Sequence, residues 1–325
     1  MIQKEPGIII GFITKLLGFI FNFVFDIIHD NITVANSLGI SIVVITIIVR
    51  ILIWPLSIKQ VKNSLAMQHI QPELKKLQKK YPDKSDIESQ KKLNFEIQKL
   101  YAENNIHPAG GCLLAFIQLP IFMALNQLLA RSYCYISDIG DIYRNLAEKI
   151  MSVPNYVGLM KPIAIPKVPP NMTIDLRIIE DMQKVINKFT STDWANLLAG
   201  LDLSVRPEIA NLLIRKESIE NFFGIDLIDQ CGLHFPGVMI PILSVVTTFL
   251  SSYFMNKMMP IEDEGAKTQQ KIFLIIMPLM MGGFSLALSS GVGVYWITSS
   301  IIQLIQQFFA NKYRKKLQEE NNNAR

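Results

Sequence analysis

The sequence contains few of the residues that usually carry out chemistry. Its 325 residues include three cysteines and four histidines, and none of the histidines falls in a predicted membrane span. Three cysteines do not make a disulfide framework, and no HExxH, CxxC or phosphate-binding glycine loop is present. These absences indicate that the chain is not an enzyme and that it needs no metal or cofactor.

Acidic residues are missing from five long apolar segments. These segments are each close to the twenty residues that a bilayer core requires, and they cover residues 36–58, 110–130, 237–256, 272–290 and 291–310. Half of the chain is apolar and its mean hydropathy is positive, which excludes a disordered chain or a nucleic-acid-binding tail. The sequence therefore predicts an all-α polytopic membrane protein with five transmembrane helices.

Arg50 is the only formal charge within any of the five predicted spans. A charge at the centre of a span costs roughly 2.5–3.5 kcal/mol on insertion-based scales. Because the spans hold no Asp or Glu, no carboxylate within them can neutralise the arginine. The favoured explanation is that Arg50 faces a water-filled cavity in the membrane.

Other polar residues within the spans are spaced to line such a cavity. Thr46 precedes Arg50 by one helical turn, and Gln118 lies midway in the second predicted span. The last span carries a polar stripe at steps of three and four, formed by Trp296, Ser299, Ser300, Gln303, Gln306 and Gln307. Together they predict a groove of amides, hydroxyls and one positive charge. Hydrogen bonding between helices is the alternative, especially for Ser299 and Ser300.

Residues 1–35 form a separate apolar segment with a polar face. The face consists of small and polar residues at steps of four and three, namely Gly11, Lys15, Gly18, Asn22, Asp26 and His29. This pattern predicts an amphipathic helix that lies in the membrane interface, and a spanning anchor is the alternative. No small-residue cleavage pattern follows, so we expect no removed signal peptide.

The charge of the connecting segments predicts the topology. Residues 59–109 contain ten Lys and Arg against six Asp and Glu, and residues 131–236 contain eleven against thirteen. Because basic loops stay in the cytoplasm, we place the amino terminus outside. We place the 59–109 segment, the 257–271 loop and a short basic 311–325 tail in the cytoplasm.

The two long connecting segments are both expected to be helical. Residues 59–109 show two apolar stripes around the turn sequence YPDKSD, which predicts a helical hairpin. It is either a solvated loop or a mobile basic arm that meets a substrate, a ribosome or lipid head groups. The external 131–236 segment predicts a small helical cap, with one helix around Met182 and another opening at Pro207. Cys134 and Cys231 lie near its two ends, as a disulfide pair or as free thiols.

Several stretches resemble one known family. They are VRILIWPLSIKQ followed by AMQHIQPELKKLQKKYPD, then LYAENNIHPAGGCLLAFIQLPIFMAL, FFGIDL and GVGVYWITSSIIQLIQQ. In sequence and order they resemble the YidC-type membrane-protein insertases of the Oxa superfamily, in a form typical of bacteria with a single membrane. Leu114 stands where the family commonly has proline, and the external segment is longer than usual for the family.

The resemblance implies a hydrophilic groove in the plasma membrane through which newly made membrane proteins pass their polar tails. Its residues would be Arg50, Thr46, Gln118 and the aromatic pair Tyr295 and Trp296. Ser299 and Gln303 of the polar stripe extend this set. The partners implied are nascent membrane proteins and the lipid bilayer, with a Sec-type translocon and the ribosome as further candidates and no direct nucleic acid. The rival hypothesis from the residues alone is a small transporter or channel that binds an anion at Arg50.

Overall fold

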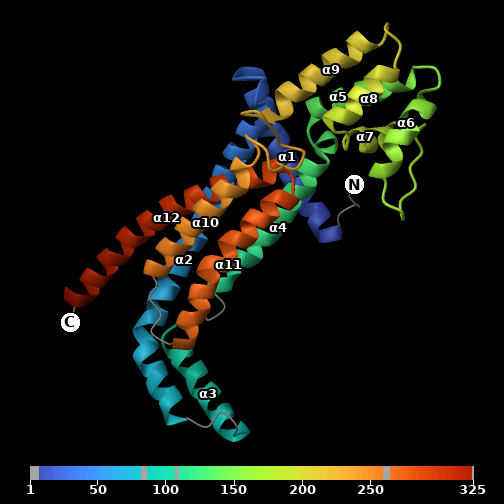
Figure 1. The fold of residues 1–325 in the computed structure, drawn as a ribbon. Helices are drawn as coiled ribbons and strands as arrows, with labels where there is room; N and C mark the ends of the chain where they lie inside the picture. Colours follow the sequence, from blue (N-terminus) through green and yellow to red (C-terminus); the bar gives the residue numbers. More distant parts are fainter. Residues whose placement is uncertain (1–6, 82–85, 107–109, 259–263, 324–325) are drawn as a thin grey trace. The chain divides into compact units, whose positions relative to one another are not determined.

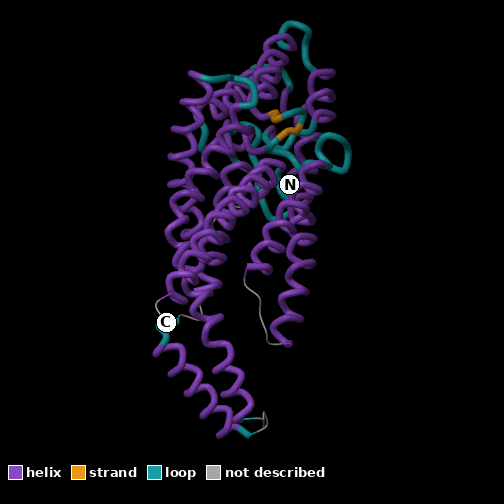
Figure 2. Tube along the Cα trace, turned by 90° about the vertical axis from the view of Figure 1, so that its left-hand side faces the viewer, coloured by secondary structure: helices purple, strands orange, loops and turns teal. Residues whose placement is uncertain are grey.

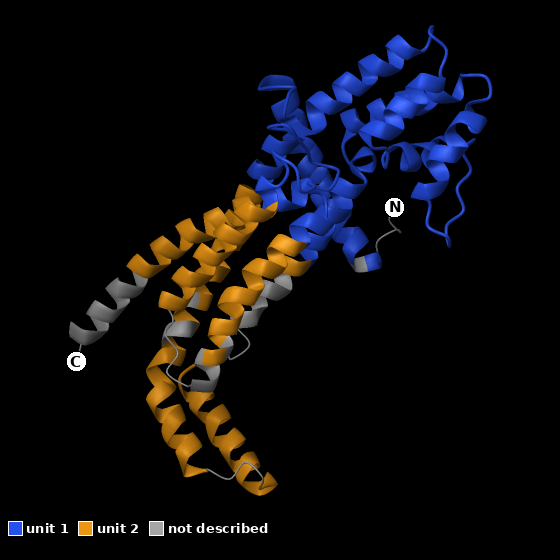
Figure 3. Cartoon of the chain, in the orientation of Figure 1, with its two compact units in different colours: residues 1–45, 120–240, 284–295 blue, residues 46–119, 241–283, 296–325 orange. Residues whose placement is uncertain are grey.

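A computed structural model describes residues 7–81, 86–106, 110–258 and 264–323, and for some helical residues, among them 110–117 and 313–323, it describes the backbone only. It is almost entirely helical (Figure 1), with two strands of two residues each (Figure 2). The chain divides into two compact units (Figure 3), unit 1 with residues 1–45, 120–240 and 284–295, and unit 2 with residues 46–119, 241–283 and 296–325. Each unit is described by itself.

The elements follow one another with short connections. In chain order they are α1 (Ile8–Asn31), α2 (Ser37–Lys80), α3 (Ile87–Glu103), α4 (Gly110–Ala130), η1 (Ser132–Cys134), α5 (Ser137–Met151), α6 (Tyr156–Ala164), η2 (Ile165–Lys167), α7 (Ile179–Ile186), α8 (Ser191–Gly200), α9 (Arg206–Glu220), β1 (Asn221–Phe222), β2 (Ile225–Asp226), α10 (Met239–Met258), α11 (Glu264–Ala287) and α12 (Ser290–Asn323).

Four helical stretches among the described residues are long and apolar enough to cross a membrane. They are Ile10–Asn31, Ser37–Gln60, Met239–Lys257 and Gln270–Ala287. The protein is therefore a polytopic membrane protein. The described apolar stretch of α4, Gln118–Ala130, is shorter, and glutamines and serines lower the hydropathy of α12. All five predicted spans are helical, but the count of five and the interfacial position of α1 stay predictions.

Helix α1 uses the face predicted to be polar for packing within unit 1. The side-chain oxygen of Asn22 accepts a hydrogen bond of 2.7 Å from the Ser137 N–H at the start of α5. A methyl group at Gly18 would lie 2.8 Å from the ring of Tyr135, so glycine permits a close approach there. The opposite face, with Phe12, Phe19 and Phe23 among others, is exposed.

Helix α2 is longer than expected, because the first predicted span and the first arm of the hairpin form one helix. It runs for 44 residues through two internal prolines. The sequence divides these elements at residue 58, whereas the backbone shows no break there. Each proline removes only one backbone hydrogen-bond donor. The Lys- and Gln-rich sequence after residue 58 has good helix propensity, so the helix continues.

The hairpin of α2 and α3 is closed by a small apolar core in unit 2. Ile70, Leu100 and Ile106 are buried at its centre, with Leu74 and Leu77 packed against them. The side chain of Asp86 caps α3 by accepting hydrogen bonds from the backbone N–H groups of the first turn. The two arms share this core, as expected of the helical hairpin predicted from the sequence, and most of the predicted turn, residues 82–85, lies outside the described residues.

The 131–236 segment, which we call the cap, is a packed helical cluster in unit 1. Helix α5 packs against α7 and α9, and the side chain of Tyr143 is completely buried among them. Met182 and Val185 on α7 are also completely buried, and Pro207 lies in the first turn of α9. The predicted helices at these positions are confirmed.

The end of the cap is hydrogen-bonded to the corner between α11 and α12. The Gly291 N–H donates to the Leu227 carbonyl at 2.9 Å, and the Ser290 N–H donates to the Asp229 carbonyl at 2.7 Å. A methyl group at Gly291 would lie 3.0 Å from the Leu227 carbonyl oxygen and 2.8 Å from Leu129. This glycine therefore allows the bend after β2 to lie directly on the start of α12.

Candidate functional site

Arg50 is buried and held by the polar stripe of α12. Its Nε donates a hydrogen bond of 2.7 Å to Ser299 Oγ, and Nη2 lies 3.4 Å from Gln303 Oε1. In return, Gln306 Nε2 donates to the backbone carbonyl of Arg50 at 3.0 Å. Because Ser299, Gln303 and Gln306 are spaced by four and three residues, one face of α12 presents all three groups to α2.

A second polar seam joins α12 to α10. Trp296 Nε1 donates to Thr248 Oγ1 at 2.8 Å, and Ser251 Oγ donates to the Ser300 carbonyl at 3.0 Å. Gln307 Nε2 donates to the Ser251 carbonyl at 3.3 Å. Part of the polar stripe therefore does form hydrogen bonds between helices. Ser299 and Gln306 bond to α2, and Trp296 and Gln307 bond to α10.

A cavity of about 330 Å³ opens beside these seams, within unit 2. Five helices supply its lining, which comprises Arg50, Gln60, Gln118, Thr248, Ser251, Ser252, Met255, Asn256, Phe273, Leu274, Met277, Trp296, Ser300 and Gln303. The volume would hold on the order of ten water molecules. One charge, several amides and hydroxyls, and an apolar wall from α11 give this space both polar and apolar surfaces.

Four of the predicted site residues line this cavity: Arg50, Gln118, Trp296 and Gln303. Ser299 does not line it but accepts the hydrogen bond from Arg50.

Two predicted residues lie elsewhere. Thr46 is completely buried one turn before Arg50 on α2 and is not part of the lining. Tyr295 is buried and is also not part of the lining.

The contribution of α10 was not predicted from the sequence. Thr248, Ser251, Ser252 and Asn256 all line the cavity, and their steps of three and four place them on one helix face. The signal was therefore present in the run TTFLSS and the asparagine that follows it. Gln60, which also lines the cavity, was missed because it lies just beyond the first predicted span, which ends at residue 58.

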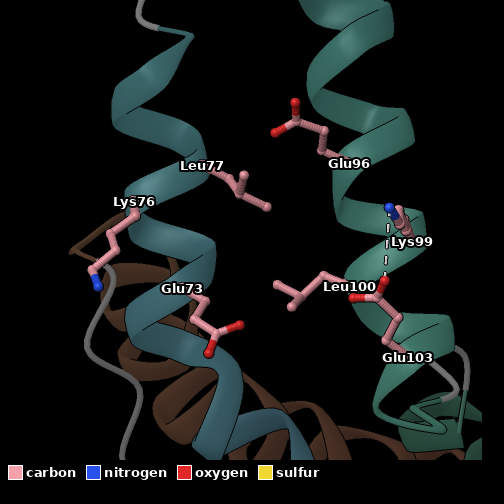
Figure 4. Close-up of a pocket in the computed structure, with 7 residues that line it drawn as sticks. All are labelled: Glu73, Lys76, Leu77, Glu96, Lys99, Leu100 and Glu103. Atoms are coloured by element: carbon pink, nitrogen blue, oxygen red, sulfur yellow. Dashed lines mark ion pairs between the residues drawn. The ribbon is translucent and has the colours of Figure 1, made fainter.

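A second hollow, of about 400 Å³, lies between the arms of the hairpin. Figure 4 shows Leu77 of α2 and Leu100 of α3 projecting into the space between the two helices, with Glu73 and Glu96 also lining it. Lys99 pairs with Glu103 at 3.8 Å along α3. The hollow is a surface feature of the hairpin and shares no residue with the Arg50 cavity.

The cap contains a buried ionic cluster. Glu220 is 1% exposed, and Lys216 Nζ lies 2.6 Å from its Oε2 and 3.9 Å from Asp226 Oδ2. Burial raises the pKa of Glu220 to about 7, although the charge of Lys216 opposes this shift. Burial alone would lower the pKa of Lys216, but Glu220, Tyr143 and Asp226 outweigh it and raise that pKa well above its ordinary value.

The two cap cysteines are free thiols. Cys134 is exposed, and the Cys231 thiol donates to the Ser285 carbonyl at 3.3 Å. The third cysteine, Cys112, has a side chain outside the described set. Within residues 7–81, 86–106, 110–258 and 264–323, no group of His, Cys, Asp and Glu side chains is placed to hold a metal ion.

Together, the apolar helices and the cavity around a buried arginine define a multi-pass α-helical membrane protein with a polar site among its helices. Residues 28–319 match the model of the family described as 60Kd inner membrane protein. The chain belongs to this family, that of the YidC/Oxa membrane-protein insertases. The resemblance noted in the sequence is thereby confirmed.

Two individual relatives are similar in sequence over most of the chain, and a third over a shorter stretch. It is 29% identical to membrane protein insertase YidC 1 of Lactococcus lactis subsp. lactis over 277 residues, covering 85% of this chain and 69% of that protein. It is 25% identical to membrane protein insertase YidC of Fusobacterium nucleatum subsp. nucleatum, covering 85% and 87%. A shorter stretch of 94 residues is 44% identical to membrane protein insertase YidC of Oceanobacillus iheyensis, covering 29% and 37%.

Proposed function

We propose that this insertase takes the polar segments of newly made membrane proteins into the cavity beside Arg50. As a member of its family the chain is a membrane-protein insertase, not an enzyme. The observation that carries the proposal is a buried guanidinium on the wall of a cavity of about 330 Å³ that is lined from five helices. A buried charge is costly to keep in a membrane protein and usually marks a functional site.

The proposed mechanism needs no nucleotide. Arg50 attracts acidic or polar residues beside the substrate's apolar helix, and the reduced dielectric of the cavity strengthens the attraction. The polar lining shortens the hydrocarbon path that this segment must cross. The apolar helix then moves sideways into lipid, and this transfer releases roughly 25 cal/mol for each Å² of apolar surface removed from water.

The cavity lining supports a role for both of its surfaces. Thr248, Ser251 and Gln303 can exchange hydrogen bonds with a passing backbone, whereas Phe273 and Met277 offer apolar contact on the α11 side. Methionine adapts its shape to different partners. A lining of this kind can accept substrates of different sequence, because it requires of the substrate only one polar and one apolar face.

The orientation in the membrane is part of the proposal. The basic hairpin and the carboxyl end are cytoplasmic, and the cap and the amino end are external. With α4 and α12 as spans the chain crosses the bacterial plasma membrane five times, and α1 lies in the external interface. The contact between Asn22 of α1 and Ser137, beyond the end of α4, supports this position for α1. Docking of a Sec-type translocon or a ribosome on the cytoplasmic side is an expectation.

The test is insertion of a small single-span protein into proteoliposomes that contain the purified chain alone, read out by protection from protease. We expect Arg50→Ala to reduce insertion and Lys59→Ala to leave it near the native level. Lys59 is exposed on the same helix, so the second variant controls for the loss of one positive charge. Equal insertion by all three proteins would contradict the role of Arg50. Arg50-dependent anion flux without insertion would instead favour the transporter hypothesis.

A further inference from the structure

Three loops of unit 1 expose large apolar side chains that do not line the cavity beside Arg50. Phe223 at the turn between β1 and β2 is 78% exposed, and Phe235 in the loop before α10 is 83% exposed. Leu233 in the same loop is also exposed, as are Ile32 and Val34 between α1 and α2. We call these five residues the apolar loop patch.

The turn between β1 and β2 contacts both of the other loops and so brings the three together. The Phe223 N–H donates a hydrogen bond of 3.1 Å to Asn36 Oδ1, which joins the strand turn to the α1–α2 loop. A methyl group at Gly224 would lie 3.2 Å from Pro236, next to Phe235. The 231–237 loop folds back on itself, because Gly237 approaches the Cys231 carbonyl too closely for any side chain. Leu233 and Phe235 therefore project from its tip.

The exposure of Phe223 is maintained against a conformational cost. Phe223 has a φ of 53° and Gly224 a φ of 85°. A bulky residue rarely adopts the left-handed region, and such strain is often found where a residue has a function. The turn is held from two sides, since Asn221 Oδ1 also accepts the Gly224 N–H at 2.7 Å. The phenylalanine is thus fixed in an outward position that a polar or small residue would adopt more readily.

The position of the patch identifies its partner. Two of its three loops directly adjoin the ends of stretches able to cross a membrane, because α1 ends at Asn31, α2 begins at Ser37 and α10 begins at Met239. The third, the turn at Phe223, is hydrogen-bonded to Asn36 at the start of α2. The apolar surface of the loops is therefore continuous with surfaces that face lipid. Aromatic side chains are enriched at this level, where hydrocarbon meets head groups.

We propose that the apolar loop patch is immersed in the bilayer interface on the cap side and fixes the cap to lipid. The same segment that carries the patch continues into the residues hydrogen-bonded to Ser290 and Gly291 at the start of α12. Lipid contact at Phe223 and Phe235 thereby holds the cap against the membrane at the point where it meets that corner.

The test is photochemical cross-linking in the full chain, in vesicles of zwitterionic phosphatidylcholine without substrate. The photoreactive p-benzoylphenylalanine replaces Phe223, Phe235 or Leu203 in turn, and mass spectrometry identifies the adducts. Leu203 is a matched control, since it is also 78% exposed and belongs to the same cap. It precedes α9 whereas Phe223 follows it, and the 15 residues of α9 separate them by about 22 Å.

We expect phospholipid adducts at positions 223 and 235 in several-fold excess over position 203. Equal yields at all three positions, or no lipid adduct at 223 and 235, would overturn the proposal. In a second arm with a single-span substrate present, replacement of lipid adducts by substrate adducts would also overturn it and assign the patch to substrate. Because the first arm contains no substrate, its result is independent of the insertion mechanism at Arg50.

Discussion

The charge of Arg50 should discriminate between substrates, and the structure sets the size of this effect. A cavity of about 330 Å³ corresponds to a sphere of radius about 4 Å, so a substrate carboxylate inside it lies roughly 6 Å from the guanidinium. At that distance and an effective dielectric constant of about 40, the attraction is about 1.4 kcal/mol, or about tenfold in occupancy. Arg50→Gln should therefore lower insertion of an acidic-tailed substrate about tenfold relative to a neutral-tailed one.

The assay compares two single-span substrates that differ only in two acidic or two neutral residues in the translocated tail. Native protein, Arg50→Gln, Arg50→Lys and Ser299→Ala are reconstituted at equal density, and the ratio of insertion rates is measured. Arg50→Lys keeps the charge and should keep the ratio. Ser299→Ala removes a hydrogen-bond partner of Arg50 but leaves its charge, so it serves as the matched control.

Salt gives an independent check of the same reasoning. The Debye length falls from about 10 Å at 0.1 M to about 3 Å at 1 M ionic strength, so the native preference for the acidic tail should shrink in high salt. The reasoning would be refuted by an Arg50→Gln protein that keeps the native ratio, or by a ratio that salt leaves unchanged. Either result would mean that Arg50 has a structural role.

Three further predictions concern the cap, the hairpin and the thiols. Because the pKa of Glu220 is raised from 4.5 to about 7 in the folded cap, cap stability should fall as pH rises between these values, by up to about 3 kcal/mol. Hydrogen exchange of α9 should report this fall in native protein and a flatter profile in Glu220→Gln. Leu100→Ala should destabilise the hairpin by about 2–3 kcal/mol, with faster proteolysis there and slower substrate capture, and unchanged capture would argue against the arm hypothesis. Without reductant, maleimide should modify Cys134 before Cys231, whose pKa is raised by burial, and a protein with no reactive thiol at either position would contradict the unpaired state.

The sequence predicted the helices well and their ends less well. Apolar runs placed α2, α4, α10, α11 and α12, because burial in lipid demands apolar residues whatever the tertiary contacts. A division between the first span and the first arm of the hairpin was predicted at residue 58, where polarity changes, whereas the structure shows one continuous helix. Hydropathy indicates whether a helix is surrounded by lipid or by water, and one helix can continue from lipid into water.

The site was predictable to the extent that its residues are unusual. Arg50 and the glutamines of α12 stand out in an apolar span, and Gln303 does lie beside Arg50. The hydroxyls of α10 do not stand out, because serine and threonine can satisfy themselves within a helix. Thr247 does so by donating to the Leu243 carbonyl at 2.7 Å, whereas its neighbour Thr248 accepts from Trp296. The choice between these two outcomes depends on which neighbour helix is present, and one sequence does not contain that information.

The continuity of α2 has a mechanical consequence. Arg50 and the hairpin end at Lys80 belong to one helix within unit 2, and thirty residues of helix make a rod of about 45 Å. A sideways push on the hairpin is therefore a torque on the arginine, with Pro55 and Pro72 as the points where the rod bends most easily. A partner that binds and moves the hairpin would therefore also move the part of α2 that carries Arg50 and lines the cavity.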